Sequence, residues 1–460
     1  MKNHHPRFVA ALFVCLGLAP FAYGQDLRIV TYNIEADING YTTARQGLSD
    51  VLEAIGTQSV AGVNQPIDIL ALEETTSNTT TVDPIVSSLN TYYASIGSTA
   101  AYARSTYQAK EVNNNPSSGN GPNALIYNSS TLTLLASVGL GVPANVSREP
   151  VRYEFCPVGG TPAEDFYVYV SHYKSGTATS GSPTNAAKRQ TEAALIRTDE
   201  ATLPADARVV YVGDFNTSSA NDLFANLMAS GQGQAFDPLT GTATPSGAFY
   251  APVSAYSDSS TSLHYRDDDE VVTQNVLNDA AGLQYISGTY RSFGNNGTTG
   301  SGKSTNLTTN TSLSNLTGPF ASQQSTILAE LTTASDHLPT VADYSLPLLG
   351  DANLDGKVDG RDFRIMDAFY LTGGGTATWR NGDFNGDGVV DYLDYAIAIA
   401  SLQSQPHTAL ADQLTGLYAS AFGSDFTAAL AADTPEPGTL LLSGLAASAF
   451  LFRRSRRPRA

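Results

Sequence analysis

Short apolar runs that end at polar residues recur through residues 26–345. Each is rich in β-branched or aromatic residues and stops at Asn, Glu, His or Asp, as in "LRIVTYN" and "VVYVGDFN". Such runs predict buried β-strands. In "VVYVGDFN", Asp214 and Asn216 follow the break at Gly213, and an extended chain would point both side chains the same way. A carboxylate and a carboxamide there suit an Asx turn as well as a metal or phosphate site.

Similar strand signals occur along the whole of this region. They lie at 27–36, 67–75, 123–130, 165–176, 209–216, 262–277 and 332–344. Two stretches between them, 43–58 and 185–203, are candidates for helices. Strands that alternate with helices and hairpins predict an α/β sandwich, with the polar strand ends gathered along one edge of its sheets.

Composition limits the class of protein. The chain has 460 residues, which is enough for two or three domains, and 42% of them are hydrophobic, which is enough for a large core. The formal net charge is −18. This charge argues against tight non-specific attraction to nucleic acid or anionic membranes, but it does not exclude a nuclease that uses bound cations.

The N-terminus has the pattern of a secretory signal. Lys2 and Arg7 precede an apolar run that is short for a membrane span, and the small residues near Gly24 suit cleavage. We therefore expect residues 1–24 to direct export through the Sec pathway. Only Cys156 lies beyond this segment, so the mature chain cannot form an intramolecular disulfide.

The C-terminus has the pattern of a second targeting signal. "PEP" at 435–437 is followed by an apolar stretch and then by five arginines. This order, over 434–460, resembles the PEP-CTERM sorting signal, although a plain tail anchor would share parts of it. The resemblance implies a cell-envelope or extracellular location, transient membrane anchoring and processing by an exosortase. Residues 404–433 are expected to be a linker.

Two loops of the same spacing, 351–362 and 383–394, precede this linker. Each offers oxygen ligands at positions 1, 3, 5, 9 and 12, a backbone carbonyl at position 7, and glycine at position 6, which suits Ca²⁺. The predicted ligands are Asp351, Asn353, Asp355, Lys357, Asp359 and Asp362 in the first loop, and Asp383, Asn385, Asp387, Val389, Asp391 and Asp394 in the second. The duplicated loops resemble a dockerin type I module over 349–403. The resemblance implies bound Ca²⁺ and a cohesin-like partner; a calcium-stiffened spacer is the alternative.

The polar strand ends also have a recognisable order. Asn33, Glu74, His172, "GDFN" at 213–216 and "SDHLP" at 335–339 follow one another through 26–345. This order resembles the endonuclease/exonuclease/phosphatase superfamily, whose fold is the deoxyribonuclease I-like four-layer α/β sandwich. We expect that fold for 26–345, followed by a small all-α calcium-loop module.

The resemblance also implies roles for individual residues. The implied catalytic residues are His172, Asp214, Asn216, Asp268 and His337, and the implied ligands of Mg²⁺ or Mn²⁺ are Asn33, Glu74 and Asp336. Asp214 and Asn216 would orient the attacking water and bind phosphate, and His172 would hydrogen-bond a phosphate oxygen. His337 would act as general base or position the nucleophile. Arg148 and Arg189 are lesser candidates for phosphate contact or for a structural role.

Two details depart from the family pattern or stay open. Glu73 stands where the family has Gln, and we expect it to face the other side of its strand from Glu74. Asp268 is chosen as the partner that fixes the tautomer of His337, although Asp269 fits the local apolar pattern better.

A His whose pKa lies near neutral pH, held by an Asp, can take the proton from water, and a divalent cation beside it suits the hydrolysis of phosphate esters. We expect a monomeric, exported, metal-dependent phosphoesterase, first of all an extracellular nuclease that acts on DNA or RNA. The alternatives are a non-catalytic calcium-binding surface or matrix protein, and a phospholipid or sugar-phosphate phosphatase in a polysaccharide-degrading setting.

Overall fold

The computed structural model describes residues 24–36, 45–112, 121–142, 146, 148–217, 219–244, 266–295, 310–372, 375–405 and 408–433. The predicted signal peptide and sorting segment lie outside these residues. The chain divides into two compact units, one from Gly24 to Pro347 and one that begins at Leu348. Every helix in the described part is too short or too polar to cross a membrane.

Two sheets form the centre of the first unit. One has the strand order β11-β13-β1-β2-β4-β3, with β12 also paired to β13, and the other has the order β5-β6-β7-β8-β10-β9. In the first sheet the strands are β1 (Asp26–Asn33), β2 (Ile69–Glu73), β3 (Tyr102–Arg104), β4 (Ala124–Asn128), β11 (Gln284–Tyr285), β12 (Arg291–Ser292) and β13 (Thr340–Ser345). In the second they are β5 (Leu132–Gly139), β6 (Val151–Pro157), β7 (Phe166–His172), β8 (Arg208–Asp214), β9 (Ala235–Phe236) and β10 (Asp268–Thr273).

Each sheet has two parallel strands at its centre. These pairs are β1 with β2 and β7 with β8, and the flanking strands β13 and β10 run antiparallel to them. The carboxyl ends of the four parallel strands and the amino ends of β10 and β13 therefore lie at one end of the sheets. That end carries the polar residues singled out in the sequence.

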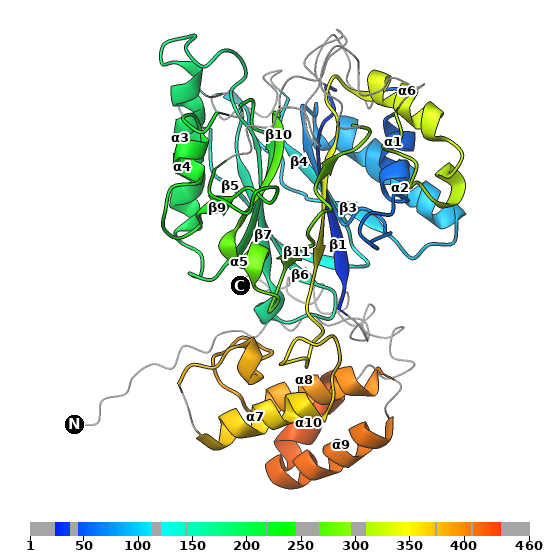
Figure 1. Cartoon of the computed structure of the whole chain (residues 1–460), viewed down its shortest axis with the longest axis vertical. Helices are drawn as coiled ribbons and strands as arrows, with labels where there is room; N and C mark the ends of the chain where they lie inside the picture. The colour runs from blue at the N-terminus through cyan, green and yellow to red at the C-terminus, as the bar shows by residue number, and fades with distance from the viewer. Residues whose placement is uncertain are drawn as a thin grey trace, which may run out of the picture. The chain divides into compact units, whose positions relative to one another are not determined.

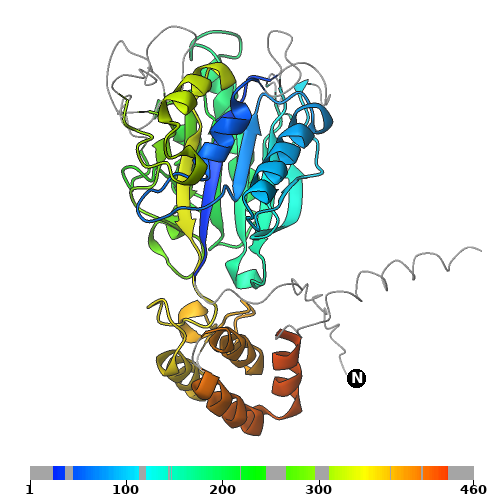
Figure 2. The ribbon, with the colours of Figure 1, turned by 90° about the vertical axis from the view of Figure 1, so that its right-hand side faces the viewer.

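Helices cover the outer face of each sheet, as Figures 1 and 2 show for this unit. On one side lie α1 (Leu48–Ile55), α2 (Asp83–Ser95) and α6 (Gln324–Ala334), and on the other lie α3 (Asn185–Glu200) and α4 (Phe224–Leu227). The short helix α5 (Gln274–Asn278) follows β10. The predicted four-layer α/β sandwich is confirmed.

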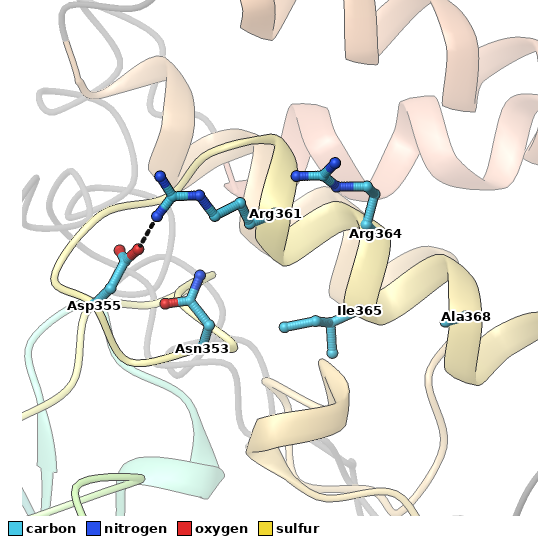
Figure 3. A pocket seen from close by; sticks show the side chains of 6 residues that line it. All are labelled: Asn353, Asp355, Arg361, Arg364, Ile365 and Ala368. Carbon is cyan, nitrogen blue, oxygen red and sulfur yellow. Dashed lines mark hydrogen bonds and ion pairs between the residues drawn. The ribbon is translucent and has the colours of Figure 1, made fainter.

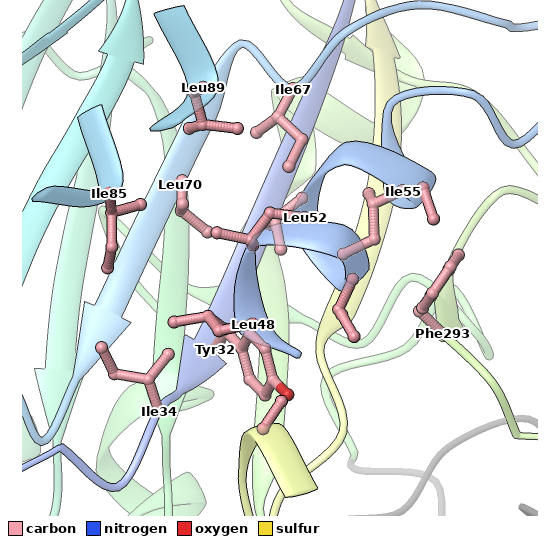
Figure 4. Packing of buried hydrophobic residues seen from close by; sticks show 14 of the residues in the cluster. Tyr32, Ile34, Leu48, Leu52, Ile55, Ile67, Leu70, Ile85, Leu89 and Phe293 are labelled. Atoms are coloured by element: carbon pink, nitrogen blue, oxygen red, sulfur yellow. The ribbon is translucent and has the colours of Figure 1, made fainter. Parts of the chain in front are cut away.

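Alternation along the strands sorts the core into layers. Tyr32 and Leu70 point outward to α1, where Figure 4 shows them beside Leu48 and Leu52, whereas Ile29 and Ala71 point inward to the second sheet. Leu48, Leu52 and Ile55 recur at the spacing that gives a helix one apolar face. The inward-facing parity of β1, β2, β7 and β8 also includes Asn33, Glu73, His172 and Asp214, which places these side chains between the sheets at their shared end.

The second unit is helical. Its helices are α7 (Gly360–Thr372), α8 (Tyr392–Gln403), α9 (Thr408–Phe422) and α10 (Ser424–Asp433). The last two differ from the linker predicted over 404–433. They fold because Tyr418, Phe426 and Leu430 bury their side chains within the unit. This end of the chain is thus an extension of the calcium module as far as the described residues reach.

Candidate active site and calcium loops

Strained backbone marks the shared end of the sheets. Glu35, Glu74 and Asn216 have positive φ angles of 47°, 56° and 53°. Glu74 directly follows β2, and Glu35 and Asn216 come two residues after the ends of β1 and β8. Asn tolerates this conformation better than Glu, and such residues cost on the order of 1 kcal/mol or more each. Gly213 has a φ of 138°, and a Cβ there would lie 1.8 Å from the carbonyl oxygen of Ser171. Only glycine therefore lets β8 approach β7 closely enough to deliver Asp214.

His337 and Asp268 form a dyad. The His337 Nδ1 lies 2.7 Å from Asp268 Oδ2, and Asp268 is buried at the first position of β10. Burial alone would lower the pKa of His337, but the carboxylates of Asp268, Asp214 and Asp336 raise it well above its ordinary value. The dyad fixes which ring nitrogen faces the site, because Nδ1 is engaged by Asp268 and Nε2 is left for other groups.

Asp214 lies at the centre of the site. Its Oδ2 accepts a hydrogen bond of 3.1 Å from Asn33 Nδ2 and lies 3.3 Å from His172 Nε2 and 3.8 Å from His337 Nε2. Its Oδ1 accepts from the backbone N–H of Asn216 at 2.9 Å. Burial raises the pKa of Asp214 well above its ordinary value, against the opposing effect of His337. Asp214 is therefore a stronger base than an exposed carboxylate.

His172 is a neutral neighbour of Asp214. Burial, followed by the positive charge of Arg148, lowers the pKa of His172 well below its ordinary value. Within the described part of the chain its Nδ1 is buried without a hydrogen-bond partner. His172 Nε2 and Arg148 Nη2 both lie 3.8 Å from Glu74 Oε1. The side chains of His172, at the end of β7, and of Arg148, from a separate segment, thus approach the same oxygen of Glu74.

Glu74 has the features of a metal ligand. Its residue surface is 8% exposed, and its Oε1 lies 3.8 Å from the nitrogens of Arg148 and His172, which is beyond hydrogen-bond distance. Carboxylate oxygens are the protein ligands that Mg²⁺ prefers, and Mg²⁺ keeps several waters, which suits a site open at one end. The residues present therefore fit a divalent cation held at Glu74.

The other predicted metal ligands are placed differently. The Asp336 side chain is 41% exposed, and its Oδ1 lies 3.8 Å from His337 Nε2. The oxygen of the Asn33 amide accepts from the backbone N–H of Glu35. Among the described residues, the acidic and histidine side chains whose ligand atoms lie within 4.8 Å of one another are Asp214, Asp268 and His337. The predicted catalytic residues gather more tightly than the predicted metal ligands.

Asn216 has a positioning role in this structure. Its side-chain Nδ2 donates to the backbone carbonyl of Tyr173 at 3.1 Å, while its backbone N–H binds Asp214. These two contacts tie the end of β8 to the end of β7. Asn216 therefore holds Asp214 in place through both its backbone and its side chain.

The structure decides between the two neighbouring aspartates. Asp268 stands opposite Asp214 in the β10–β8 register, whereas Asp269 stands opposite Gly213 and points to the other side. Asp269 Oδ1 pairs with Arg266 Nε at 2.6 Å. The choice of Asp268 as the partner of His337 thus agrees with the geometry.

The prediction that Glu73 faces away from the site is wrong. Glu73 has the inward parity of Asn33, its partner in the β1–β2 register, and its Oε1 accepts a 2.9 Å hydrogen bond from Thr31. Burial, and then the charge of Asp268, raises the pKa of Glu73 well above its ordinary value. The left-handed turn at Glu74 breaks the strand alternation, so both glutamates lie on the inner side.

Glu35 lies at this end of the sheets and was not singled out from the sequence, and Arg148, a lesser candidate there, has its Nη2 3.8 Å from Glu74 Oε1. Glu35 follows Asn33 by two residues and pairs with Arg45. The signal was present in "YNIEA", where a carboxylate stands two residues after the strand end at Asn33. Arg189, by contrast, is structural: it is buried, it pairs with Asp222 at 2.6 Å and it donates to the backbone of Lys174.

The two calcium loops have matching internal hydrogen bonds. At position 12, Asp362 accepts from the backbone N–H groups of Ala352, Asn353 and Asp359, and Asp394 does the same in the second loop. At position 1, Asp351 and Asp383 accept from the glycines at position 6. Burial raises the pKa of Asp394 to about 7. A bound cation would stabilise the charged form of these buried carboxylates.

An open groove of about 500 Å³ lies beside the first loop (Figure 3). Asn353 and Asp355 line it from the loop, and Arg361, Arg364, Ile365 and Ala368 line it from α7. Arg361 Nη1 donates to Asp355 Oδ2 at 2.7 Å. One of the predicted calcium ligands is thus also held by a surface arginine.

Comparisons with known proteins identify the C-terminal parts of the chain. Residues 349–403 match the family model of the Dockerin type I domain, and residues 433–457 match that of the PEP-CTERM protein-sorting motif. Both resemblances predicted from the sequence are confirmed. The first implies bound Ca²⁺, and the second indicates export and anchoring through the C-terminus. A comparison with curated proteins found no match.

Similar solved structures cover the first unit. They include TDP2 from D. rerio complexed with single strand DNA product (13% identity, TM-score 0.40, 70% of this chain and 99% of that one). The endonuclease/exonuclease/phosphatase from Bacteroides vulgatus (15%, 0.40, 70% and 99%) and the human nocturnin catalytic domain with bound sulfate (16%, 0.41, 70% and 94%) are also among them. Similarity at this level does not establish a shared activity, so function has to be inferred from the side chains of the site.

Proposed function

We propose that this chain is an exported, metal-dependent phosphoesterase, and that its activity is that of an extracellular nuclease acting on phosphodiesters. The observation that carries the proposal is the convergence on Asp214 of Asn33, His172 and the His337–Asp268 dyad from four other strands or their flanks. A buried carboxylate with raised basicity beside a fixed imidazole suits the activation of water for attack on phosphorus.

In this mechanism Asp214 accepts the proton of the attacking water. Its Oδ2 faces both histidines and Asn33, so a water or phosphoryl oxygen placed there meets donors on several sides. His337, whose positive charge Asp268 favours, donates from Nε2 to a phosphoryl oxygen. His172 and Asn33 hold the phosphate in line with the water. These groups stabilise charge that develops on the phosphoryl oxygens.

Glu74 would hold Mg²⁺ or Mn²⁺, with Asp336 and Asn33 as further ligands. A bound divalent cation neutralises the phosphoryl group and stabilises the leaving oxygen. Glu35, next to Asn33, belongs to the same end of the sheet. Arg148, 3.8 Å from Glu74, keeps the carboxylate oriented toward the site.

The C-terminal parts support a location for this activity outside the cytoplasm. We propose that the chain leaves through the Sec pathway, is anchored transiently by its last residues and is processed by an exosortase near residues 435–437. The dockerin module would bind Ca²⁺ in both loops and present the enzyme to a cohesin-like partner. Calcium in these loops and the catalytic cation are separate requirements.

The test is an assay of the exported chain on single-stranded DNA, RNA, bis-p-nitrophenyl phosphate and a phospholipid. Each substrate is offered with Mg²⁺, Mn²⁺, Ca²⁺ or EDTA. We expect cation-dependent cleavage of the nucleic acids and the diester, and a loss of roughly 10²–10⁴-fold in kcat for His337→Ala. Asp83→Asn, a half-exposed carboxylate outside the site, is the control. No cleavage under any condition would favour the non-catalytic calcium-binding surface protein.

A further inference from the structure

Positive side chains gather beside His172 in a chain whose net charge is −18. Lys174 lies two residues after His172, and Lys188 is on the first turn of α3. Arg148 approaches from another segment, with its Nη2 3.8 Å from Glu74 Oε1. Burial lowers the pKa of Lys174, and the charges of Arg148 and Lys188 lower it further, which is the effect of cations within electrostatic reach.

The backbone around Lys174 is held by α3. The N–H of Lys174 donates to Glu192 Oε2 at 3.2 Å, and its carbonyl accepts from Arg189 Nη1 at 2.6 Å. Arg189 in turn is buried and paired with Asp222. The position of Lys174 relative to His172 and Lys188 is therefore fixed by buried contacts and not by an exposed loop alone.

The two lysines are not neutralised. In the described part of the chain neither forms an ion pair, and the recorded side-chain contact of Lys174 is a 3.4 Å hydrogen bond from Nζ to Ser175 Oγ. Arg28, Arg189, Arg266 and Arg291 all have a carboxylate partner. The nearby carboxyl is that of Glu192: burial raises its pKa well above its ordinary value, and the charges of Arg148, Arg189 and Lys174 oppose this shift.

We propose that Lys174 and Lys188, together with Arg148, form a second anion subsite that binds a phosphate group next to the scissile one. The inference rests on the proposed function. It names the substrate class as an ester with at least two phosphates, with a nucleic-acid strand as the natural form. An ester with a single phosphate would occupy the catalytic residues and leave the subsite empty.

The subsite would attract a polyanionic substrate to an acidic protein. A polyanionic substrate is repelled by the acidic surface as a whole, and a local group of cations both steers it to the site and releases counterions when it binds. The contribution of each lysine should therefore appear in the salt dependence of binding and in KM, while the chemical step stays with Asp214 and His337.

The test compares Lys174→Gln and Lys188→Gln with Arg364→Gln, which removes one exposed positive charge from the calcium module. The substrates are a single-stranded oligonucleotide and bis-p-nitrophenyl phosphate, which has one phosphate. We expect each lysine variant to raise KM for the oligonucleotide roughly two- to fivefold and to leave the kinetics on the small diester unchanged. The slope of log affinity against log salt should fall by about 0.7 per lysine. Lys174→Arg should retain most of the affinity.

Binding gives a readout that does not depend on turnover. Fluorescence anisotropy of the labelled oligonucleotide is measured with the lysine changes placed in a His337→Ala background. Unchanged affinity and salt slope, or equal losses on both substrates, would overturn the subsite. If the wild-type chain cleaves neither substrate, the proposed function fails, and the anisotropy result alone decides whether the lysines bind a polyanion.

Discussion

Asp268 and Asp269 are neighbours in sequence, yet they belong to two separate networks. Asp268 points to the site and holds His337, while Asp269 joins Arg266 and the hydroxyl of Tyr290 on the other side of β10. Arg266 also pairs with Asp237, so that network is a buried structural one. Because neighbouring residues of a strand face opposite sides, Asp268 belongs to the dyad with His337 and Asp269 belongs to the buried structural network.

Asp268→Asn should lower kcat by roughly 10²–10⁴-fold with little change in Tm, because the orientation and charge of His337 are lost while the shape is kept. Asp269→Asn is the matched control. It should lower Tm, because Arg266 loses one of its two buried carboxylates, and it should leave kcat within a few-fold. Steady-state kinetics and thermal denaturation of both variants check this. Equal kinetic losses would mean that the register does not separate the two residues.

Glu164 predicts a pH dependence of stability. It is buried, its Oε2 accepts from the N–H of Thr161 at 3.1 Å, and burial raises its pKa from 4.5 to about 8. The folded state then binds this proton more tightly than the unfolded state between those two pH values. Stability from this group is full below pH 4.5 and is lost as the pH rises through 8.

Glu164→Gln keeps an acceptor for Thr161 and removes the charge. Its Tm should match that of the wild type near pH 5 and exceed it at pH 8.5, by roughly 2–4 °C for each kcal/mol relieved. Asp206→Asn, at an exposed carboxylate, should leave the difference between the two pH values unchanged. A higher Tm for the wild type than for Glu164→Gln at pH 8.5 would show that the ionised form of Glu164 is stabilised by its surroundings.

At the scale of elements, α9 and α10 complete the core of the calcium module. Tyr395 of α8 and Tyr418 of α9 both donate to Asp367 Oδ1 on α7, at 2.8 and 3.0 Å. Phe422 packs on Tyr395 with ring centroids 5.2 Å apart, and Phe426 lies next in the cluster. An aromatic cluster with a shared carboxylate thus ties the helix after each calcium loop to the added helices.

Phe426→Ala should destabilise this module by about 3–5 kcal/mol, because it empties a fully buried position on α10. Leu417→Ala, at a side chain that is 57% exposed, should change stability by less than about 0.5 kcal/mol. Trp379 is the single tryptophan of the chain and is buried in the short helix Trp379–Asn381, so its fluorescence during urea denaturation follows this module alone. Equal midpoints for the two variants would mean that α10 is not part of the core.

At the scale of the whole molecule, the two units have separate cores and different dependence on cations. Three apolar clusters lie in the first unit, and the second unit buries apolar side chains of its own, among them Phe363, Met366 and Ile399. The second unit also has the carboxylates of two calcium loops at the starts of α7 and α8. Trp379 Nε1 donates to the carbonyl of Asp351, the first ligand position of the first loop. We therefore expect tryptophan fluorescence to respond to calcium binding.

Removal of Ca²⁺ should lower the unfolding temperature of the second unit and shift Trp379 fluorescence, because the loop carboxylates then repel one another. The transition of the first unit, followed by circular dichroism of its sheets, should stay in place. Ca²⁺ should restore the signal, and Mg²⁺ at equal concentration should not. A single transition that moves as a whole would show that the units unfold together.

The sequence by itself determined the features that are local in the chain. The calcium loops and the sorting signal each lie in one contiguous segment, so ligand spacing and order were enough to predict them. The strand ends at Asn33, Glu74, His172 and Asp214 were also visible, because an apolar run that stops at a polar residue is a local pattern. The α/β sandwich followed from the alternation of such strands with helices, and its four layers were implied by the resemblance to the endonuclease/exonuclease/phosphatase superfamily.

Only the tertiary structure decided which side chains meet. His337 and Asp268 are 69 residues apart, and Asn33 and Asp214 are 181 apart, so strand register and not spacing brings them together. Glu73 faces inward by its strand register with Asn33, and the left-handed backbone at Glu74 brings that glutamate to the inner side as well. The packing of α9 and α10, and the cations beside His172, depend on contacts between distant segments. Sequence patterns report the conformation of each segment, whereas a site depends on how the folded core places several segments at one end of its sheets.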